Sequence, residues 1–485
     1  MSLWIGAAFL ACLSVSLING GPLYYFDSGG YLDNGVKVLR QFGFLAAEGG
    51  SGSDGAGAAA SDVAVNTVNG ARSLVYSLMS TVAALALGAN SVPILNAVAI
   101  LAAIWLPVRV GLRCLAPGLS GGMLFALPVL ASLFSALPFY VAYFMPDIFT
   151  GVLLLSVATL AVFARQMQGA EILLAVALGA IAVTSHLSHL AMVTLLVAPV
   201  LVISLVLSAQ KWWLAPVLVC AILGLGLAER AVFSLTAKAV GDSQVTYTPF
   251  LTARLIEDGA GWRYLQANCP DEQIATCILY QALQQSDDPM RLSASHMIFD
   301  TTKQLGSYRL ISQDDQRRVA QEQVSFSLAV LARYPAMTAF GFLNNTLTQA
   351  RLNSILMTVP TQRVLWRLSV VPTIPDGLIK NGRLSASRDW IEPVNTLHQV
   401  VYAISLVAMA ALVLLPSRLS GTMRAFGVML IFGIAANALV CGGISQPADR
   451  YGARVIWLLP YGATLLFLFS GMWNRKGPSR QKETQ

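Results

Sequence analysis

Charged residues are scarce in this sequence. Only 11 % of its 485 residues are Asp, Glu, Lys or Arg, whereas 56 % are hydrophobic and the mean hydropathy is +0.64. A soluble globular domain carries about 25 % charged residues. Because the hydrophobic residues also stand in long uninterrupted runs, the composition excludes a water-soluble protein and predicts a polytopic integral membrane protein.

Sequence signals of several common chemistries are absent as well. The chain has no phosphate-binding P-loop pattern, no Ser/His/Asp hydrolase signature and no CxxC metal pair. Nothing indicates nucleic-acid binding. Charged residues are nearly missing from the hydrophobic runs, so a proton or ion path through the bilayer has no obvious carrier. A coupled secondary transporter is therefore disfavoured.

The hydrophobic runs predict an all-α fold with about ten transmembrane helices. A span needs roughly 20 mostly apolar residues, because each residue of a helix advances by 1.5 Å. The runs that meet this requirement cover 2–20, 91–108, 117–137, 148–164, 170–187, 189–209, 213–228, 398–416, 425–444 and 454–472.

The distribution of basic residues predicts the orientation of these spans. With the N-terminus inside, the short inner loops and the basic tail at 473–485 hold ten basic and two acidic residues, whereas the short outer segments hold five basic and seven acidic residues. The positive-inside rule then places both termini in the cytoplasm. The apolar stretch 72–90 would invert every later span if it crossed, so we expect it to lie on the outer face as a juxtamembrane helix.

These boundaries divide the chain into modules. We expect a transmembrane module over 1–228 whose first outer loop, 21–90, carries juxtamembrane helices. A mainly helical periplasmic domain should follow over 229–396, then C-terminal transmembrane helices over 397–472.

Two further features fall in the outer segments. The Gly- and Ser-rich stretch 49–62 cannot form a packed core, and it predicts a flexible cover or gate. Cys269 and Cys277 stand eight residues apart in the outer domain, which suits a disulfide in an oxidising compartment. Two unpaired thiols are the alternative.

The segment directly after the first span, GPLYYFDSGGYLDNG, is the strongest candidate for chemistry. Asp27 stands here at the outer membrane boundary among aromatic residues that include Tyr31, and a flexible Ser28-Gly29-Gly30 follows it. A carboxylate beside aromatic rings at a low-dielectric edge has a raised pKa, which suits a general base. Alternatively, Asp27 caps a short helix and the tyrosines form an interfacial belt.

A second acid and two histidines fall on the same outer face. Asp147 opens the fourth span in MPDIFTG, where an acid at a helix start is also favourable for purely structural reasons. His186 and His189, in TSHLSHLAM, share a face if the segment stays helical. Metal binding, contact with a phosphate or substrate, and a structural role all remain open for this pair.

Two arginines mark the outer entrance of the last span. Arg450 and Arg454 flank Tyr451 in SQPADRYGARVIWLLPY. Two guanidinium groups suit a lipid phosphate or pyrophosphate, which arginine binds through two parallel hydrogen bonds. Interfacial anchoring of the helix by Arg and Tyr is the equally weighted alternative.

The order of these features resembles the GT-C superfamily of membrane glycosyltransferases, which use polyprenyl-phosphate-linked sugars on the outer face. In that superfamily an acid follows the first helix, a juxtamembrane helix precedes the second span, a Pro-Asp pair opens the fourth, and an Arg-Tyr pair lies near the last. The matching positions here are Asp27, 72–88, Pro146-Asp147, and Arg450-Tyr451 with Pro460. The resemblance covers about 1–190 well and the last span loosely.

The resemblance implies a transferase whose active site lies on the outer face of the membrane. The low charge, the outer Cys pair and the absence of eukaryotic targeting signals predict a bacterial inner membrane, so that this face is the periplasmic one. Asp27 would act as catalytic base or substrate anchor, and Asp147 would position the acceptor or hold His186. The donor phosphate would bind Arg450, with Arg454 or a histidine. The acceptor would be an envelope glycan, a lipid or a protein.

No cofactor is certain, because the first loop lacks the paired acids of metal-dependent members, and a divalent metal is therefore not supported.

Two hypotheses of another class remain. One is a non-catalytic envelope assembly protein that binds a partner through 229–396, and the other is a transporter of lipid-linked saccharides.

Overall fold

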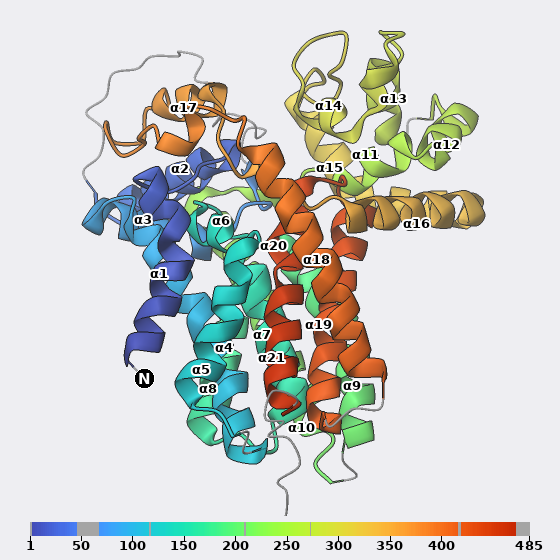
Figure 1. The fold of residues 1–485 in the computed structure, drawn as a ribbon. Helices are drawn as coiled ribbons and strands as arrows, with labels where there is room; N and C mark the ends of the chain where they lie inside the picture. The colour runs from blue at the N-terminus through green and yellow to red at the C-terminus, as the bar shows by residue number, and fades with distance from the viewer. Residues whose placement is uncertain are drawn as a thin grey trace, which may run out of the picture.

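The computed structural model describes residues 2–45, 67–115, 118–207, 210–271, 273–415 and 419–471 (Figure 1). The expected gate at 49–62 and the basic tail at 473–485 lie outside these residues. Within them the fold is almost entirely helical, as predicted, and strands β1 (Thr67–Asn69) and β2 (Gln244–Thr246) form one short parallel pair.

Seven helices among the described residues are long and apolar enough to cross a membrane, and a bent helix pair would raise this number to eight. The last of them joins two helices, α20 (Asp449–Ile456) and α21 (Leu458–Phe469), into one run. The others are α1 (Ser2–Asn19), α4 (Ser91–Leu115), α9 (Leu187–Leu207), α10 (Leu214–Gly241), α18 (Ile391–Leu414) and α19 (Gly421–Gly443).

Three shorter apolar helices occupy the other predicted spans. They are α5 (Gly121–Ala131) with the 3-10 turn η1 (Ser132–Phe134), α7 (Ile148–Phe163) and α8 (Gly169–Ser185). Every residue of α7 is buried, and this helix contacts α4, α8, α9, α10, α19 and α20. The hydrophobic core of the bundle is therefore built around α7.

One end of the bundle, called here the capped end, is covered by helices that lie outside it (Figure 1). Here α2 (Phe26–Gln41) packs along α3 (Leu74–Leu87), and α6 (Leu137–Ala142) leads into a backbone bridge between Leu23 and Tyr143. α3 has 14 residues, as many as α5 and η1 together, so its length does not decide whether it crosses the membrane. Its closest packing is along α2, outside the bundle, and this favours the surface placement of 72–90.

The hydrophilic segment 229–396 is helical but does not form one unit. Its first residues belong to α10, which continues to Gly241. A separate hydrophobic core then joins the helices between 250 and 333, called here the helical unit. These are α11 (Phe250–Glu257), α12 (Ala260–Asn268), α13 (Thr276–Leu283), η2 (Pro289–Leu292), α14 (Ala294–Phe299) and α15 (Gln313–Arg333).

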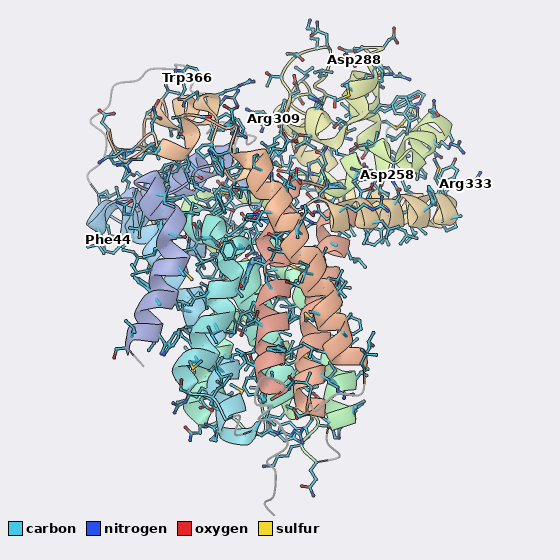
Figure 2. All side chains as sticks on the ribbon, in the orientation of Figure 1. Phe44, Asp258, Asp288, Arg309, Arg333 and Trp366 are labelled. Atoms are coloured by element: carbon cyan, nitrogen blue, oxygen red, sulfur yellow. A yellow bond between two sulfur atoms is a disulfide. The ribbon has the colours of Figure 1, made fainter. Side chains whose placement is uncertain are left out.

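The helical unit is connected to the bundle through α16 (Pro335–Arg351), which bends from α15 by 112° at the break between them. Asn345 of α16 donates hydrogen bonds of 2.8 and 3.0 Å to Asp258, which directly follows α11 (Figure 2). α16 also packs against α19, where Gly442 and Gly443 leave room for its backbone and for a phenylalanine ring.

The remainder of the segment returns to the capped end. It contains η3 (Ile355–Met357), α17 (Gln362–Ser369) and η4 (Arg383–Ser385). A small core joins Leu365 and Leu368 of α17 to Tyr24 and Leu32 at the start of the chain. Trp366 of α17 is exposed on the outside of this cover (Figure 2). The capped end thus combines segments from the start of the chain with the segment around α17, which is far from them in sequence.

Candidate functional site

Asp27 lies in the first turn of α2 between two guanidinium groups. Its Oδ1 accepts a hydrogen bond from Nη2 of Arg72 and its Oδ2 accepts one from Nη1 of Arg450, both at 3.3 Å. The side chain of Asp27 is 36 % exposed, whereas that of Arg450 is 8 % exposed. The carboxylate is therefore accessible, while the arginine that holds it is anchored inside the protein.

The local sequence explains how α2 presents this acid. Ser28 Oγ accepts a hydrogen bond from the Tyr25 N–H and donates one to the Phe144 carbonyl, both at 2.9 Å, which fixes the first turn. A β-carbon at Gly30 would lie 2.4 Å from Arg72 Cζ, so a larger residue here would displace the guanidinium, which is the flexible end of its side chain. The expectation of a flexible Ser28-Gly29-Gly30 is wrong, because these residues are helical and their small size serves close packing.

Two aromatic rings pack against the guanidinium of Arg450. Its Cζ lies 4.8 Å from the ring centroids of Tyr25 and of Tyr451, and its backbone carbonyl accepts a 2.6 Å hydrogen bond from Tyr140 Oη. These two cation–π contacts restrict the movement of the planar guanidinium. One edge of that plane points at Asp27, so the geometry suits an anion bound at the same edge.

The charge around Asp27 corrects the expected pKa. Burial alone would raise the pKa of this carboxyl group, but the attraction of Arg72 and Arg450 outweighs burial and lowers it below its ordinary value. Asp27 is therefore ionised at neutral pH. Its basicity depends on how strongly the two guanidinium groups remain engaged with it.

Arg454, one turn further along α20, is buried completely and does not face the Asp27 carboxylate. Its Nη1 lies 3.4 Å from Asp147 Oδ1, and its other donors bond to Asn437 Oδ1 at 2.9 and 3.0 Å and to Ser188 Oγ at 3.2 Å. Each nitrogen of this buried guanidinium already bonds to a protein acceptor, so the structure does not favour the expected contact with a phosphate.

Asp147 has no exposed surface, and its carboxylate makes no capping bond to α7. It pairs with Arg454 rather than with His186, and its Oδ2 has no hydrogen-bond partner among the described residues. The structure therefore favours an internal ion pair over a helix cap as the reason for an acid here.

The two histidines lie beside this pair but do not share a helical face. His186 stands between α8 and α9 in an extended conformation, and His189 is in the first turn of α9, with ring centroids 5.4 Å apart. Both His189 nitrogens are used, Nε2 with Thr150 Oγ1 at 2.8 Å and Nδ1 with the Ala182 carbonyl at 2.6 Å. His189 thus has a structural role. His186 bonds through Nδ1 to Ser188.

Tyr31 lies one turn after Asp27 on α2 and is buried. Its side chain packs edge-on against the Tyr76 ring, with centroids 5.1 Å apart. Burial raises the pKa of Tyr31, and the charges of Asp27 and Asp147 raise it further. Its phenol is therefore neutral, and it lies within electrostatic reach of both acids that the sequence singled out.

The sequence pattern missed several residues of this cluster. Arg72 contacts Asp27 directly, and Asn437 accepts hydrogen bonds from Arg454. Together, three arginines and two carboxylates leave a surplus of one positive charge in the cluster made of Arg72, Arg450, Arg454, Asp27 and Asp147. Arg72 was visible only as a basic residue before an apolar helix, a signal without specificity.

Metal ligands and the cysteines are separate from this cluster. No group of three His, Cys, Asp or Glu that could hold a metal occurs within the described ranges. Cys269 and Cys277 form a disulfide, which links the end of α12 to α13 in the helical unit.

No protein-family model, curated protein or solved structure matches this chain. The geometry of the cluster and the order of the helices are therefore the grounds on which a function can be inferred.

Proposed function

We propose that the protein is a membrane glycosyltransferase. It transfers a sugar from a polyprenyl-phosphate donor to an envelope glycan, a lipid or a protein, at the periplasmic face of a bacterial inner membrane. The orientation follows from the excess of basic residues in the segments assigned to the cytoplasm. The capped end is then the periplasmic end.

The observation that carries the proposal is the placement of Asp27 between Arg72 and Arg450. An accessible carboxylate and two guanidinium groups meet at a helix start beside the membrane boundary, with one positive charge in excess. This combination suits a reaction in which a phosphate is bound and a hydroxyl loses its proton. The position of Asp27 after the first helix also matches the acid of the superfamily that the sequence resembles.

The reaction would proceed as a single displacement. An acceptor hydroxyl attacks the anomeric carbon of the donor sugar while the bond from that carbon to the phosphate oxygen breaks. The hydroxyl proton moves to the Asp27 carboxylate, and the bonding electrons leave with the polyprenyl phosphate. Arg450 and Arg72 stabilise the charge of that leaving group. The configuration at the anomeric carbon is inverted, and phosphate needs no strong general acid because it is weakly basic.

The lowered pKa of Asp27 gives the two arginines a second role. Without donor, both guanidinium groups engage the carboxylate and keep it a weak base. A donor phosphate competes for the same N–H groups, so its binding releases Asp27 and restores its basicity. The base is then strongest when the donor is in place.

The buried Asp147–Arg454 pair supports this site from behind. Arg454 and Arg450 lie one turn apart on α20, and both guanidinium groups contact the Tyr451 ring, at 5.1 and 4.8 Å. Fixing Arg454 with Asp147 and Asn437 therefore fixes the face of α20 that presents Arg450. Asp147 and Arg454 would be positioning residues in this scheme.

Native mass spectrometry of the detergent-purified protein with added polyprenyl phosphate tests the donor site. The wild type should retain the lipid, and Arg450→Ala should bind it at least tenfold more weakly, because a hydrogen bond to a charged group contributes about 1.5–3 kcal/mol. Arg363→Ala is the matched control, since Arg363 is exposed on α17 at the same end. Lipid retained equally by all three would contradict the assignment.

The chemical step is tested separately with Asp27→Asn. This variant should still bind polyprenyl phosphate but should lose sugar transfer in membranes supplied with lipid-linked sugars. If Asp27→Asn transfers sugar at the wild-type rate, Asp27 is not the base. If neither wild type nor variant binds the lipid, the non-catalytic assembly function through 229–396 becomes the better hypothesis.

A further inference from the structure

A cavity of about 630 Å³ lies at the end of the bundle opposite the capped end. It opens between the first turns of α1, the last turns of α4 and the start of α5, where Figure 1 shows the N-terminus of α1 far from α2 and α17. Small-molecule sites typically occupy roughly 300–1,000 Å³. The lining residues are Ile5, Trp105, Val108, Arg109, Leu112, Arg113, Gly121, Gly122, Phe125 and Gln168.

Two lining arginines share one buried carboxylate. Glu171 is 3 % exposed, and its oxygens accept hydrogen bonds of 2.8 Å from Arg109 Nε, from Nη1 and Nη2 of Arg113 and from the Gln168 N–H. The carboxylate is therefore saturated. The three ionised side chains carry one net positive charge, and this charge stands beside a largely apolar wall.

Arg109 is the group with donors to spare. Its side chain is 47 % exposed, and its Nη1 and Nη2 have no hydrogen-bond partner among the described residues. Its Cζ lies 4.9 Å from the ring centroid of Trp105, which fixes the guanidinium at the mouth of the cavity. Nη1 and Nη2 of a guanidinium can bind two oxygens of one phosphate.

We propose that this cavity binds an anionic phospholipid from the leaflet at that end of the bundle. The phosphate would bind Arg109, the indole of Trp105 would lie at the headgroup level, and an acyl chain would pack on Ile5, Val108 and Phe125. The cavity is flanked by the ends of two membrane-spanning helices, α1 and α4, so lipid is the molecule present at highest concentration beside it.

The charge selects the class of lipid. One surplus positive charge is neutralised by one phosphodiester, whereas a zwitterionic lipid would bring its own ammonium group towards Arg109. A basic residue at an anionic membrane surface contributes about 1 kcal/mol, which corresponds to about a fivefold preference. This inference is independent of the glycosyltransferase proposal, because it concerns the other end of the bundle.

Native mass spectrometry from nanodiscs with equal amounts of phosphatidylglycerol and phosphatidylethanolamine tests the site. The wild type should retain phosphatidylglycerol with about a fivefold preference. Arg109→Gln should lose this preference and Arg109→Lys should keep most of it. Arg165→Gln is the matched control, because Arg165 is bound to the Leu207 carbonyl on an inner loop and does not line the cavity.

A preference for phosphatidylglycerol that Arg109→Gln leaves intact would overturn the site, as would an equal loss in Arg165→Gln. Soluble glycerol phosphate should fail to displace the lipid at millimolar concentration. If it succeeds, the cavity binds a free phosphate ester and the assignment to a phospholipid is wrong. An unchanged melting temperature in Arg109→Gln shows that the variant is folded.

Discussion

Replacing one member of the buried Asp147–Arg454 pair should destabilise the protein far more than replacing both members together. Both side chains are inaccessible, and Arg454 Nη1 lies 3.4 Å from Asp147 Oδ1. Leaving one buried charge unpaired costs about 3–5 kcal/mol. We expect Asp147→Leu to lower the free energy of unfolding by about 3 kcal/mol, because Arg454 still has Asn437 and Ser188 as hydrogen-bond partners. We expect Arg454→Met to lower it by about 5 kcal/mol, because one oxygen of Asp147 already lacks a partner.

The double variant Asp147→Leu/Arg454→Met removes both charges together. Replacing a buried ion pair by apolar side chains is often neutral, and the main cost left is the loss of the Arg454 donors by Asn437 and Ser188, about 1–3 kcal/mol. We therefore expect the double variant to be more stable than either single variant or close to the milder one. Independent effects would instead add to about 8 kcal/mol.

Reversible unfolding in mixed micelles, with increasing denaturing detergent and helix content as the signal, measures these differences. The exposed pair Asp314–Arg317 on α15 is the matched control, because Asp314 is 79 % exposed and its replacement by leucine should change stability by about 1 kcal/mol or less. A double variant destabilised by the sum of the single effects would refute the reasoning, since it would show that the two charges do not interact.

Three more predictions follow from the geometry. Gly35→Ala on α2 should lower stability by about 1–3 kcal/mol because a β-carbon would lie 2.7 Å from the Ser77 carbonyl oxygen of α3, whereas Gly6→Ala in open space on α1 should not; thermal unfolding of the two variants compares them. The stability difference between wild type and Asp27→Asn should be constant above about pH 5 and should shrink as the pH falls below about 4, because a lowered pKa stabilises the fold only while the group is ionised. Reducing the Cys269–Cys277 disulfide should destabilise the helical unit by about 2.5 kcal/mol for a loop of this length, seen as faster proteolysis between 250 and 333; a double Cys→Ser variant should not respond to reductant.

The sequence was informative where hydrophobic periodicity and charge placement decide the structure. A helix occupies each of the ten apolar runs, because length and apolarity alone specify such helices. Asp27 and Arg450 could be singled out because they stand at the ends of such runs, where a polar residue has few structural reasons to be. Their direct contact was not predicted, since 423 residues separate them.

The remaining features depend on packing between segments that no local pattern connects. Arg72 packs closely against Gly30 where it reaches Asp27, and glycines in a Ser-Gly-Gly run suggest flexibility until their neighbours are known. The pKa of Asp27 was predicted in the wrong direction for the same reason. Its aromatic neighbours are adjacent in the sequence, whereas Arg72 and Arg450, which lower the pKa, come from distant segments. The segment 229–396 resembles one domain because its composition is uniform, although its end packs on α2.

The distance along the chain between Asp147 and Arg454 has a consequence for how the protein is made. A ribosome adds about 5–20 residues per second, so the 307 residues between these partners take roughly 15–60 s to synthesise. During that interval α7 must enter the membrane with an uncompensated acid at its end. Asp27 is in a different position, because Arg72 emerges only 45 residues after it and can neutralise it at once. During membrane insertion, Asp147 at the start of α7 therefore remains without its partner until the last membrane helix, which carries Arg454, has been made.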